Sequence, residues 1–241
     1  MKRIFALGIL VVALAAGAAF ANPSLLGPTG GVNLPTADVA GLSELDIALD
    51  YQDVNDAGME EAYPLRLVYG VSENTEIGFD FAKQDDNLDS WGLNAKFATP
   101  VTLGGFNWSG GIVYKQLNDG DEDGYGLYWV GSRLINEPAE GTPAARMSLG
   151  VSYIDADTLG DAFRPFVAVD FEFSNGASVI AEYQFKDSEL DDEAMGAIAL
   201  RYPFSEGFTG QVGFTNGMRG VGGMDDYDFF VGVDFNVAGG L

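Results

Sequence analysis

Apolar and polar positions alternate through residues 63–83, with a short polar turn in the middle. Every second position of its two halves is apolar or aromatic: Tyr63, Leu65, Leu67 and Tyr69, then Ile77, Phe79 and Phe81. The positions between them include Arg66, Glu76 and Asp80. A period of two indicates β-strands, so the pattern predicts a hairpin with one apolar and one charged face. That hairpin fits a soluble sheet on an apolar core, and it also fits a membrane barrel with a polar lumen.

The same alternation recurs along the chain and predicts twelve strands. Their bounds are 44–52, 63–70, 75–83, 91–98, 107–116, 125–134, 145–154, 163–173, 177–186, 193–202, 208–215 and 227–236. The strands 125–134 and 193–202 are ambiguous because they are apolar on both faces. An even strand number returns both ends of the chain to one side, as single-chain bacterial barrels require. Twelve is the prediction, with ten and fourteen as the neighbouring alternatives.

Charge is segregated between alternate connections. The odd-numbered connections are rich in Asp and Glu: 53–62, 84–90, 117–124, 155–162, 187–192 and 216–226. The even-numbered ones are poorer in charge, and three of them are very short: 71–74, 99–106, 135–144, 174–176 and 203–207. An up-and-down barrel places odd and even connections at opposite rims, whereas Greek-key crossings scatter them. The pattern therefore favours an all-β, closed, antiparallel transmembrane barrel over residues 44–241, with acidic extracellular loops.

The N-terminus carries a targeting pattern. Lys2 and Arg3 precede an apolar run, and Ala19-Phe20-Ala21 forms a small-x-small cleavage motif. This arrangement predicts a cleaved signal peptide over 1–21, hence export, with the outer membrane as the predicted location. Residues 22–43 are rich in Gly and Pro, so we predict an extended periplasmic lead-in there.

Two resemblances follow from these residues. The whole mature chain resembles bacterial outer-membrane β-barrels of the porin-like kind. The run from Gly30 to Asp38, GGVNLPTAD, followed by a strand, resembles the opening of some exopolysaccharide-associated outer-membrane proteins. The last strand, YDFFVGVDFN, resembles the C-terminal assembly signal of outer-membrane proteins, although NVAGGL follows Phe235. These likenesses imply outer-membrane lipid, lipopolysaccharide and the barrel-assembly machinery as partners; the oligomeric state stays open.

Composition excludes several functions. The formal net charge of −24 opposes binding of nucleic acid phosphates. The chain has no His, which removes the commonest general base, and no Cys, which removes thiolate chemistry. We therefore expect no enzyme activity, no catalytic residues and no cofactor.

If the apolar stripes face lipid, the opposite faces line a lumen. The predicted lumen residues are Asp46, Asp50, Arg66, Glu76, Asp80, Lys96, Lys115, Arg146, Arg164, Asp170, Glu172, Glu182, Lys186, Arg201, Asp228 and Asp234. Antiparallel register would place Arg66 between Asp50 and Asp80, Lys96 beside Glu76, and Arg146 beside Asp170 or Glu172. Such cross-strand pairs of opposite charge are stabilising.

The alternation of apolar and charged positions leaves three hypotheses for the function. The first is a narrow passive channel for small solutes, with a weak cation preference from its acidic excess. The second is a non-conducting surface or assembly protein, linked to polysaccharide export, whose ion pairs fill the interior. The third is a soluble exported β protein with the aromatic stripes as its core.

Acidic loops also offer oxygen ligands for divalent cations. The best candidate is the loop with Asp119, Asp121 and Asp123, which lacks the full spacing of an EF-hand. If this loop binds calcium, the double change Asp121→Ala/Asp123→Ala should abolish calcium-dependent thermal stabilisation. The competing interpretation is a soluble, repelling acidic rim.

Overall fold

The structure is a computed structural model that describes residues 23–24, 27–56, 59–84, 88–117, 122–136, 142–156, 160–187, 194–216 and 228–237. The predicted signal peptide lies outside these ranges, as does part of every predicted acidic connection. Within these ranges there is no helix long and apolar enough to cross a membrane.

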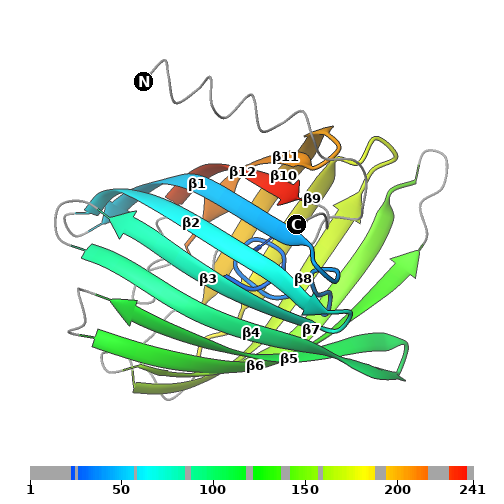
Figure 1. Cartoon of the computed structure of the whole chain (residues 1–241), viewed down its shortest axis with the longest axis horizontal. Coiled ribbons are helices and arrows are strands. Elements are labelled where there is room, and N and C mark those ends of the chain that lie inside the picture. The colour runs from blue at the N-terminus through cyan, green and yellow to red at the C-terminus, as the bar shows by residue number, and fades with distance from the viewer. Residues whose placement is uncertain are drawn as a thin grey trace.

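Twelve antiparallel strands form a closed barrel (Figure 1). The strands are β1 Leu45–Asp56, β2 Met59–Ser72, β3 Thr75–Gln84, β4 Leu88–Leu103, β5 Phe106–Leu117, β6 Glu122–Asn136, β7 Ala144–Ala156, β8 Gly160–Glu172, β9 Ser178–Gln184, β10 Met195–Ser205, β11 Phe208–Thr215 and β12 Asp228–Val237. Each pairs with its neighbours in sequence, and β1 pairs with β12 to close the ring. The prediction of a closed, twelve-stranded, up-and-down barrel is confirmed.

Short turns join alternate strand pairs at one end of the barrel, which we call the short-turn end. The β2–β3, β4–β5, β8–β9 and β10–β11 connections all lie there, because successive antiparallel strands reverse direction. The β4–β5 turn consists of Gly104 and Gly105, with φ of 65° and 80°. A two-residue hairpin turn of this kind needs positive φ at both positions, which favours glycine.

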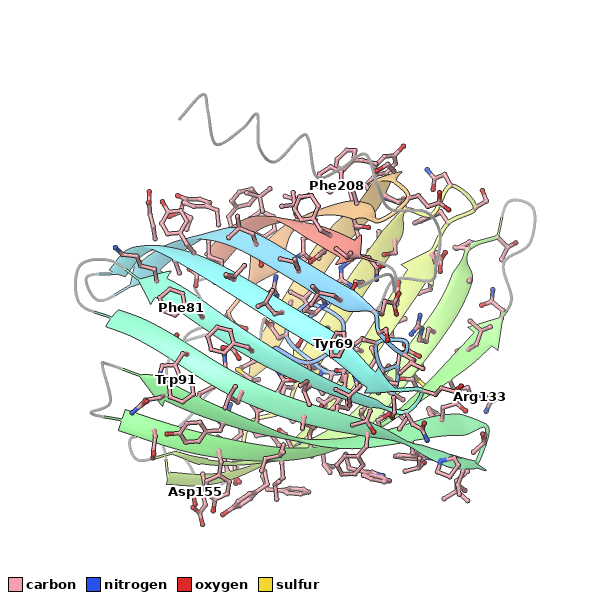
Figure 2. All side chains as sticks on the ribbon, in the orientation of Figure 1. Tyr69, Phe81, Trp91, Arg133, Asp155 and Phe208 are labelled. Carbon is pink, nitrogen blue, oxygen red and sulfur yellow. The ribbon has the colours of Figure 1, made fainter. Side chains whose placement is uncertain are left out.

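Side chains alternate between the outside and the inside of the ring. On β1, Leu49 is exposed while Ala48 and Asp50 on either side of it are buried. Aromatic side chains contribute to the outer surface, and Phe208 projects away from the barrel in Figure 2. The apolar stripes therefore form no core, which contradicts the third hypothesis of a soluble β protein. An apolar exterior around a charged interior is the arrangement of a transmembrane barrel.

Several strands extend beyond their predicted bounds. The strand predicted at 91–98 is part of β4, Leu88–Leu103, whose pairing with β5 continues to Leu103 and Phe106. The prediction followed the apolar stripe, whereas backbone pairing continues past it toward the rims. In contrast, β9 ends at Gln184, two residues before the predicted end at Lys186.

Most of the described Gly/Pro-rich segment lies inside the ring, whereas Leu42 and Ser43 are exposed just before β1. Residues 27–43 of this segment are drawn in blue between the strands in Figure 1. Val32, Leu34, Ala37 and Ala40 are all buried, and the segment bonds to inward-facing side chains of the wall. The prediction of a periplasmic lead-in over 22–43 is therefore wrong for the described part of the segment. A Gly/Pro-rich composition indicates irregular backbone, but it does not specify which surface that backbone contacts.

Candidate functional site: the barrel lumen

Most of the predicted lumen residues are buried on the inner wall. These are Asp46, Asp50, Arg66, Glu76, Asp80, Lys96, Arg164, Glu182, Arg201, Asp228 and Asp234. The residues next to them along each strand point outward. The listed side chains are therefore buried because they face the inside of the ring. The inner wall is therefore densely charged, and a buried charge is costly unless a partner compensates it.

The remaining predicted residues lie nearer the ends of the barrel. The Lys115 and Arg146 side chains are 30% and 34% exposed, and Asp170 is half-buried. Glu172 is exposed at the last position of β8 and borders a cavity described below. Lys186 is exposed beyond the end of β9, so the structure does not place it on the lumen wall.

Ion pairs compensate several of these charges. Lys96 pairs with Glu76 at 3.4 Å, as the register predicts. Arg66 pairs with Asp50, while Asp80 pairs with Lys115 at 3.0 Å rather than with Arg66. The predicted partners of Arg146 were on β8, but the structure pairs it with Asp38 of the inserted segment.

A small hairpin, residues 29–36, forms the innermost part of the inserted segment; we call it the inner hairpin. The Gly31 N–H donates to the Leu34 carbonyl at 2.9 Å, and the Thr36 N–H donates to the Thr29 carbonyl at 3.2 Å. Gly30 occupies a position where a Cβ would lie 2.2 Å from the Leu34 carbonyl oxygen. Only glycine fits such a close backbone approach.

Glu182 on β9 binds the tip of the inner hairpin. Its carboxylate accepts the N–H groups of Val32 at 2.6 Å, Asn33 at 2.7 Å and Leu34 at 3.2 Å. A carboxylate that accepts several backbone N–H groups makes strong, charge-assisted hydrogen bonds. The tip is also tied to β11, because the Asn33 amide donates to the Thr215 hydroxyl at 2.7 Å.

Arg201 on β10 binds the carbonyl side of the same tip. Its guanidinium donates to the carbonyls of Gly30 at 3.3 Å and Gly31 at 2.5 Å, and to the Gln211 side chain at 3.2 Å. Glu182 and Arg201 therefore satisfy both the donors and the acceptors of the hairpin backbone.

Glu76 on β3 binds the other end of the inner hairpin. It accepts the N–H and the hydroxyl of Thr29 at 2.8 and 2.6 Å, and the N–H of Ala40 at 2.8 Å. Lys96 on β4 donates to the Thr29 carbonyl at 2.7 Å. In a ring of twelve strands, β3 and β9 are six positions apart, as are β4 and β10. The inner hairpin therefore spans the lumen from one wall to the opposite wall.

Apolar contacts also seat the inner hairpin. Val32 packs into a cluster on the inner wall with Ile180, Ala197, Ala199 and Phe230. Leu34 packs into a second cluster with Tyr128, Val130 and Phe166. These clusters explain the two strands that are apolar on both faces, since 125–134 supplies Tyr128 and Val130 and 193–202 supplies Ala197 and Ala199.

Some buried polar atoms of the inner wall have no hydrogen-bond partner among the described residues. They include both carboxylate oxygens of Asp234, one oxygen each of Asp46 and Asp170, and the side-chain amide of Asn94. Buried polar groups in native proteins normally bond to protein or to ordered water. These wall atoms are therefore chemically suited to bind water or small polar solutes.

A cavity of about 360 Å³ borders the inner hairpin. Part of its lining comes from the inserted segment, through Thr29, Gly30, Gly31, Thr36 and Asp38. The wall contributes Arg146, Asp170, Glu172, Arg201 and Thr209 among others. The cavity is of the size of small-ligand sites, and both signs of charge face it.

Solved structures share this architecture. The KdgM porin, solved alone and in complex with disordered oligogalacturonate, superposes with a TM-score of 0.61 at 12% identity, covering 80% of this chain and 98% of that one. The NanC porin gives 0.55 at 13% identity, covering 79% and 98%. The Acinetobacter baumannii outer membrane protein Omp33 gives 0.52 at 9% identity, covering 81% and 98%. The chain has the fold of bacterial outer-membrane porins. No protein-family model and no curated protein matches its sequence.

The predicted metal site of this porin-like barrel is only partly described. Asp119 and Asp121 lie outside the described residues. Asp123 is exposed and accepts a hydrogen bond from the Tyr114 hydroxyl at 3.2 Å. The described ranges contain no group of three or more potential metal-ligating side chains. A cation in the acidic loop stays a prediction.

Sequence reasoning missed the wall hydroxyls that bind the inserted segment. The Ala37 N–H donates to the Ser132 hydroxyl at 2.8 Å, and the Ser109 hydroxyl donates to the Ala37 carbonyl at 2.5 Å. Ser132 also shares a 2.7 Å hydrogen bond with Ser148. All three serines are buried at inward positions of their strands. The alternation along each strand predicts that these serines face inward. A serine on the inner wall does not by itself indicate which group it binds.

Replacing Glu182 with alanine should free the tip of the inner hairpin. A hydrogen bond to a charged group contributes about 1.5–3 kcal/mol, so losing three of them should speed amide exchange at 32–34 by at least about tenfold. Hydrogen exchange of the folded barrel in detergent, followed by mass spectrometry, measures this rate. Glu206→Ala, at an exposed turn glutamate, is the control and should leave the exchange unchanged. Equal protection in Glu182→Ala and wild type would show that Glu182 does not hold the tip.

Proposed function

We propose that this chain is an outer-membrane β-barrel that acts as a narrow passive channel for small solutes. The observation that supports this proposal most directly is the character of the barrel wall. Twelve strands form a closed ring with an apolar outer surface and a densely charged inner surface. Charged inner walls suit a hydrated path for polar solutes, while the inner hairpin narrows that path. The likeness in fold to the KdgM and NanC porins supports a channel. We infer no enzyme activity, since the chain has no His, the commonest general base.

A weak cation preference is the second part of the proposal. Lys96, Arg66 and Lys115 each pair with a wall carboxylate, which neutralises their charge locally. Asp234 keeps two buried oxygens without a hydrogen-bond partner among the described residues, and Asp46 keeps one. Carboxylates on a pore wall favour cations.

The double change Asp46→Asn/Asp234→Asn should therefore lower the cation selectivity. The reversal potential of the refolded mature protein in a planar bilayer under a potassium chloride gradient measures it. Wild type should give a modest cation-selective potential, and the double variant should move toward zero. Asp53→Asn is the control, because Asp53 lies on the same strand as Asp46, β1, with its side chain exposed. An unchanged potential in the double variant would contradict the assignment of selectivity to these carboxylates.

The inserted segment favours a second candidate, a non-conducting barrel with a surface or assembly role. In this proposal the segment and the ion pairs would fill the lumen permanently. Stable insertion into bilayers without conductance, for wild type and for variants with a weakened segment, would support it. Partners in either case would be outer-membrane lipid, lipopolysaccharide and the barrel-assembly machinery. Co-purification with the assembly machinery after brief crosslinking in cells would test the last of these.

A further inference from the structure

Resting on the proposed channel function, we propose that the inner hairpin, residues 29–36, is a displaceable plug. In this proposal Glu182 is one of the residues that hold the plug in its closed position. The hairpin crosses the bore, since Glu76 binds one end from β3 and Glu182 binds the tip from the opposite wall. A solute that moves along the barrel axis must therefore pass this hairpin.

The wall has a built seat for the plug. Val32 and Leu34 pack into two apolar clusters on the inner surface of the wall. The backbone of Gly31 lies directly against Glu182, where a Cβ would lie 1.9 Å from a carboxylate oxygen. The hairpin therefore has a specific docked position. Its apolar side chains meet apolar clusters of the wall, its backbone meets charged side chains, and a glycine lies at the point of closest approach.

The plug is also able to leave that seat. Its tip is held by side chains of β9, β10 and β11 through hydrogen bonds, and two backbone hydrogen bonds close the hairpin itself. No strand of the barrel pairs with it along a continuous ladder in the described residues. The cavity of about 360 Å³ borders Thr29, Gly30, Gly31 and Thr36, which leaves space beside the hairpin. A unit held by side-chain contacts rather than by a backbone ladder, next to open volume, can shift without unfolding the barrel.

A pair of cysteines tests the proposal, because the chain contains no cysteine of its own. Asn33→Cys/Thr215→Cys replaces two residues whose side chains are hydrogen-bonded at 2.7 Å, one on the plug and one on β11. A disulfide or a short thiol crosslinker would fix the plug to the wall. Ser152→Cys/Gln184→Cys is the matched control, since it joins two wall residues, bonded at 2.8 Å, that make no hydrogen bond to the plug within the described ranges.

Single-channel recording in planar bilayers measures the conductance of each variant, oxidised and reduced. The crosslinked plug pair should remain at its lowest conductance level, and reduction should restore larger openings. Glu182→Ala should increase the time spent in the larger openings several-fold. The control pair should conduct equally when oxidised and reduced. Equal conductance of the crosslinked and reduced plug pair would overturn the proposal, even if the channel function stands.

A second measurement separates failure of the plug from failure of the channel. Single Asn33→Cys in intact, membrane-inserted barrels should react with a small thiol reagent at a rate that rises several-fold when Glu182→Ala is added. That rise would support a displaceable plug even if no variant conducts, in which case the channel proposal fails alone. No change in labelling rate, with folding verified by heat-shifted gel mobility, would overturn the plug.

Discussion

Replacing Lys96 with methionine should lower the free energy of unfolding of the barrel by about 3 kcal/mol. Lys96 is fully buried, pairs with Glu76 at 3.4 Å and donates to the Thr29 carbonyl at 2.7 Å. Removing the ammonium leaves the Glu76 carboxylate buried without its cation, and such a charge is costly. Urea unfolding in lipid vesicles, followed by tryptophan fluorescence, measures the change.

Two further variants make this result specific. The double change Glu76→Gln/Lys96→Met removes both charges and should recover a large part of the loss. Lys83→Met is the matched control, since Lys83 is an exposed lysine on β3 and should change stability little. A Lys96→Met barrel as stable as wild type would show that the pair is hydrated rather than buried.

Replacing Leu93 with arginine should lower the stability of the membrane-inserted barrel by about 2–4 kcal/mol. Leu93 lies midway along the pairing of β3 with β4 and faces outward, where it is 51% exposed opposite Phe79. An arginine at this position on the outer face would lie in the hydrocarbon core of the bilayer, where a charged side chain is costly. Refolding and unfolding titrations in phosphatidylcholine vesicles give the difference from wild type.

The loss of stability caused by an outward-facing arginine should depend on its depth in the membrane. Val101→Arg places the same charge near the short-turn end, at a residue that is 60% exposed, and should cost only about 0–1 kcal/mol. Equal losses at Leu93 and Val101 would mean that the outer surface has no hydrocarbon-depth gradient. That outcome would contradict the membrane-spanning arrangement.

The number and order of strands were predictable because a strand has a period of two. In β1 the inward Asp46 and Asp50 alternate with the outward Leu49 and Tyr51, and that pattern is visible in the sequence. The Lys96–Glu76 pair followed from the same register. Strand ends were predicted less well, because backbone pairing at the rims continues where side chains no longer alternate.

The position of the inserted segment was not predictable in this way. Its irregular, Gly/Pro-rich backbone has no period, and its contacts reach residues up to 182 positions away in sequence. One signal did exist. Val130 and Ala199 are apolar residues on the lumen side of their strands, and an apolar patch inside a polar lumen needs an apolar partner. Val32 and Leu34 supply it.

The contact between Asn33 and Thr215 also constrains the order of folding. The tip of the hairpin is made early in the chain, but its seat consists of side chains from β9, β10 and β11, which are made late. The segment therefore cannot settle until those strands have joined the sheet. Contacts this distant in sequence slow folding, because a long loop must close before they contribute stability. The tip of the inner hairpin is thus made early but is among the last parts of the described structure to reach its native position.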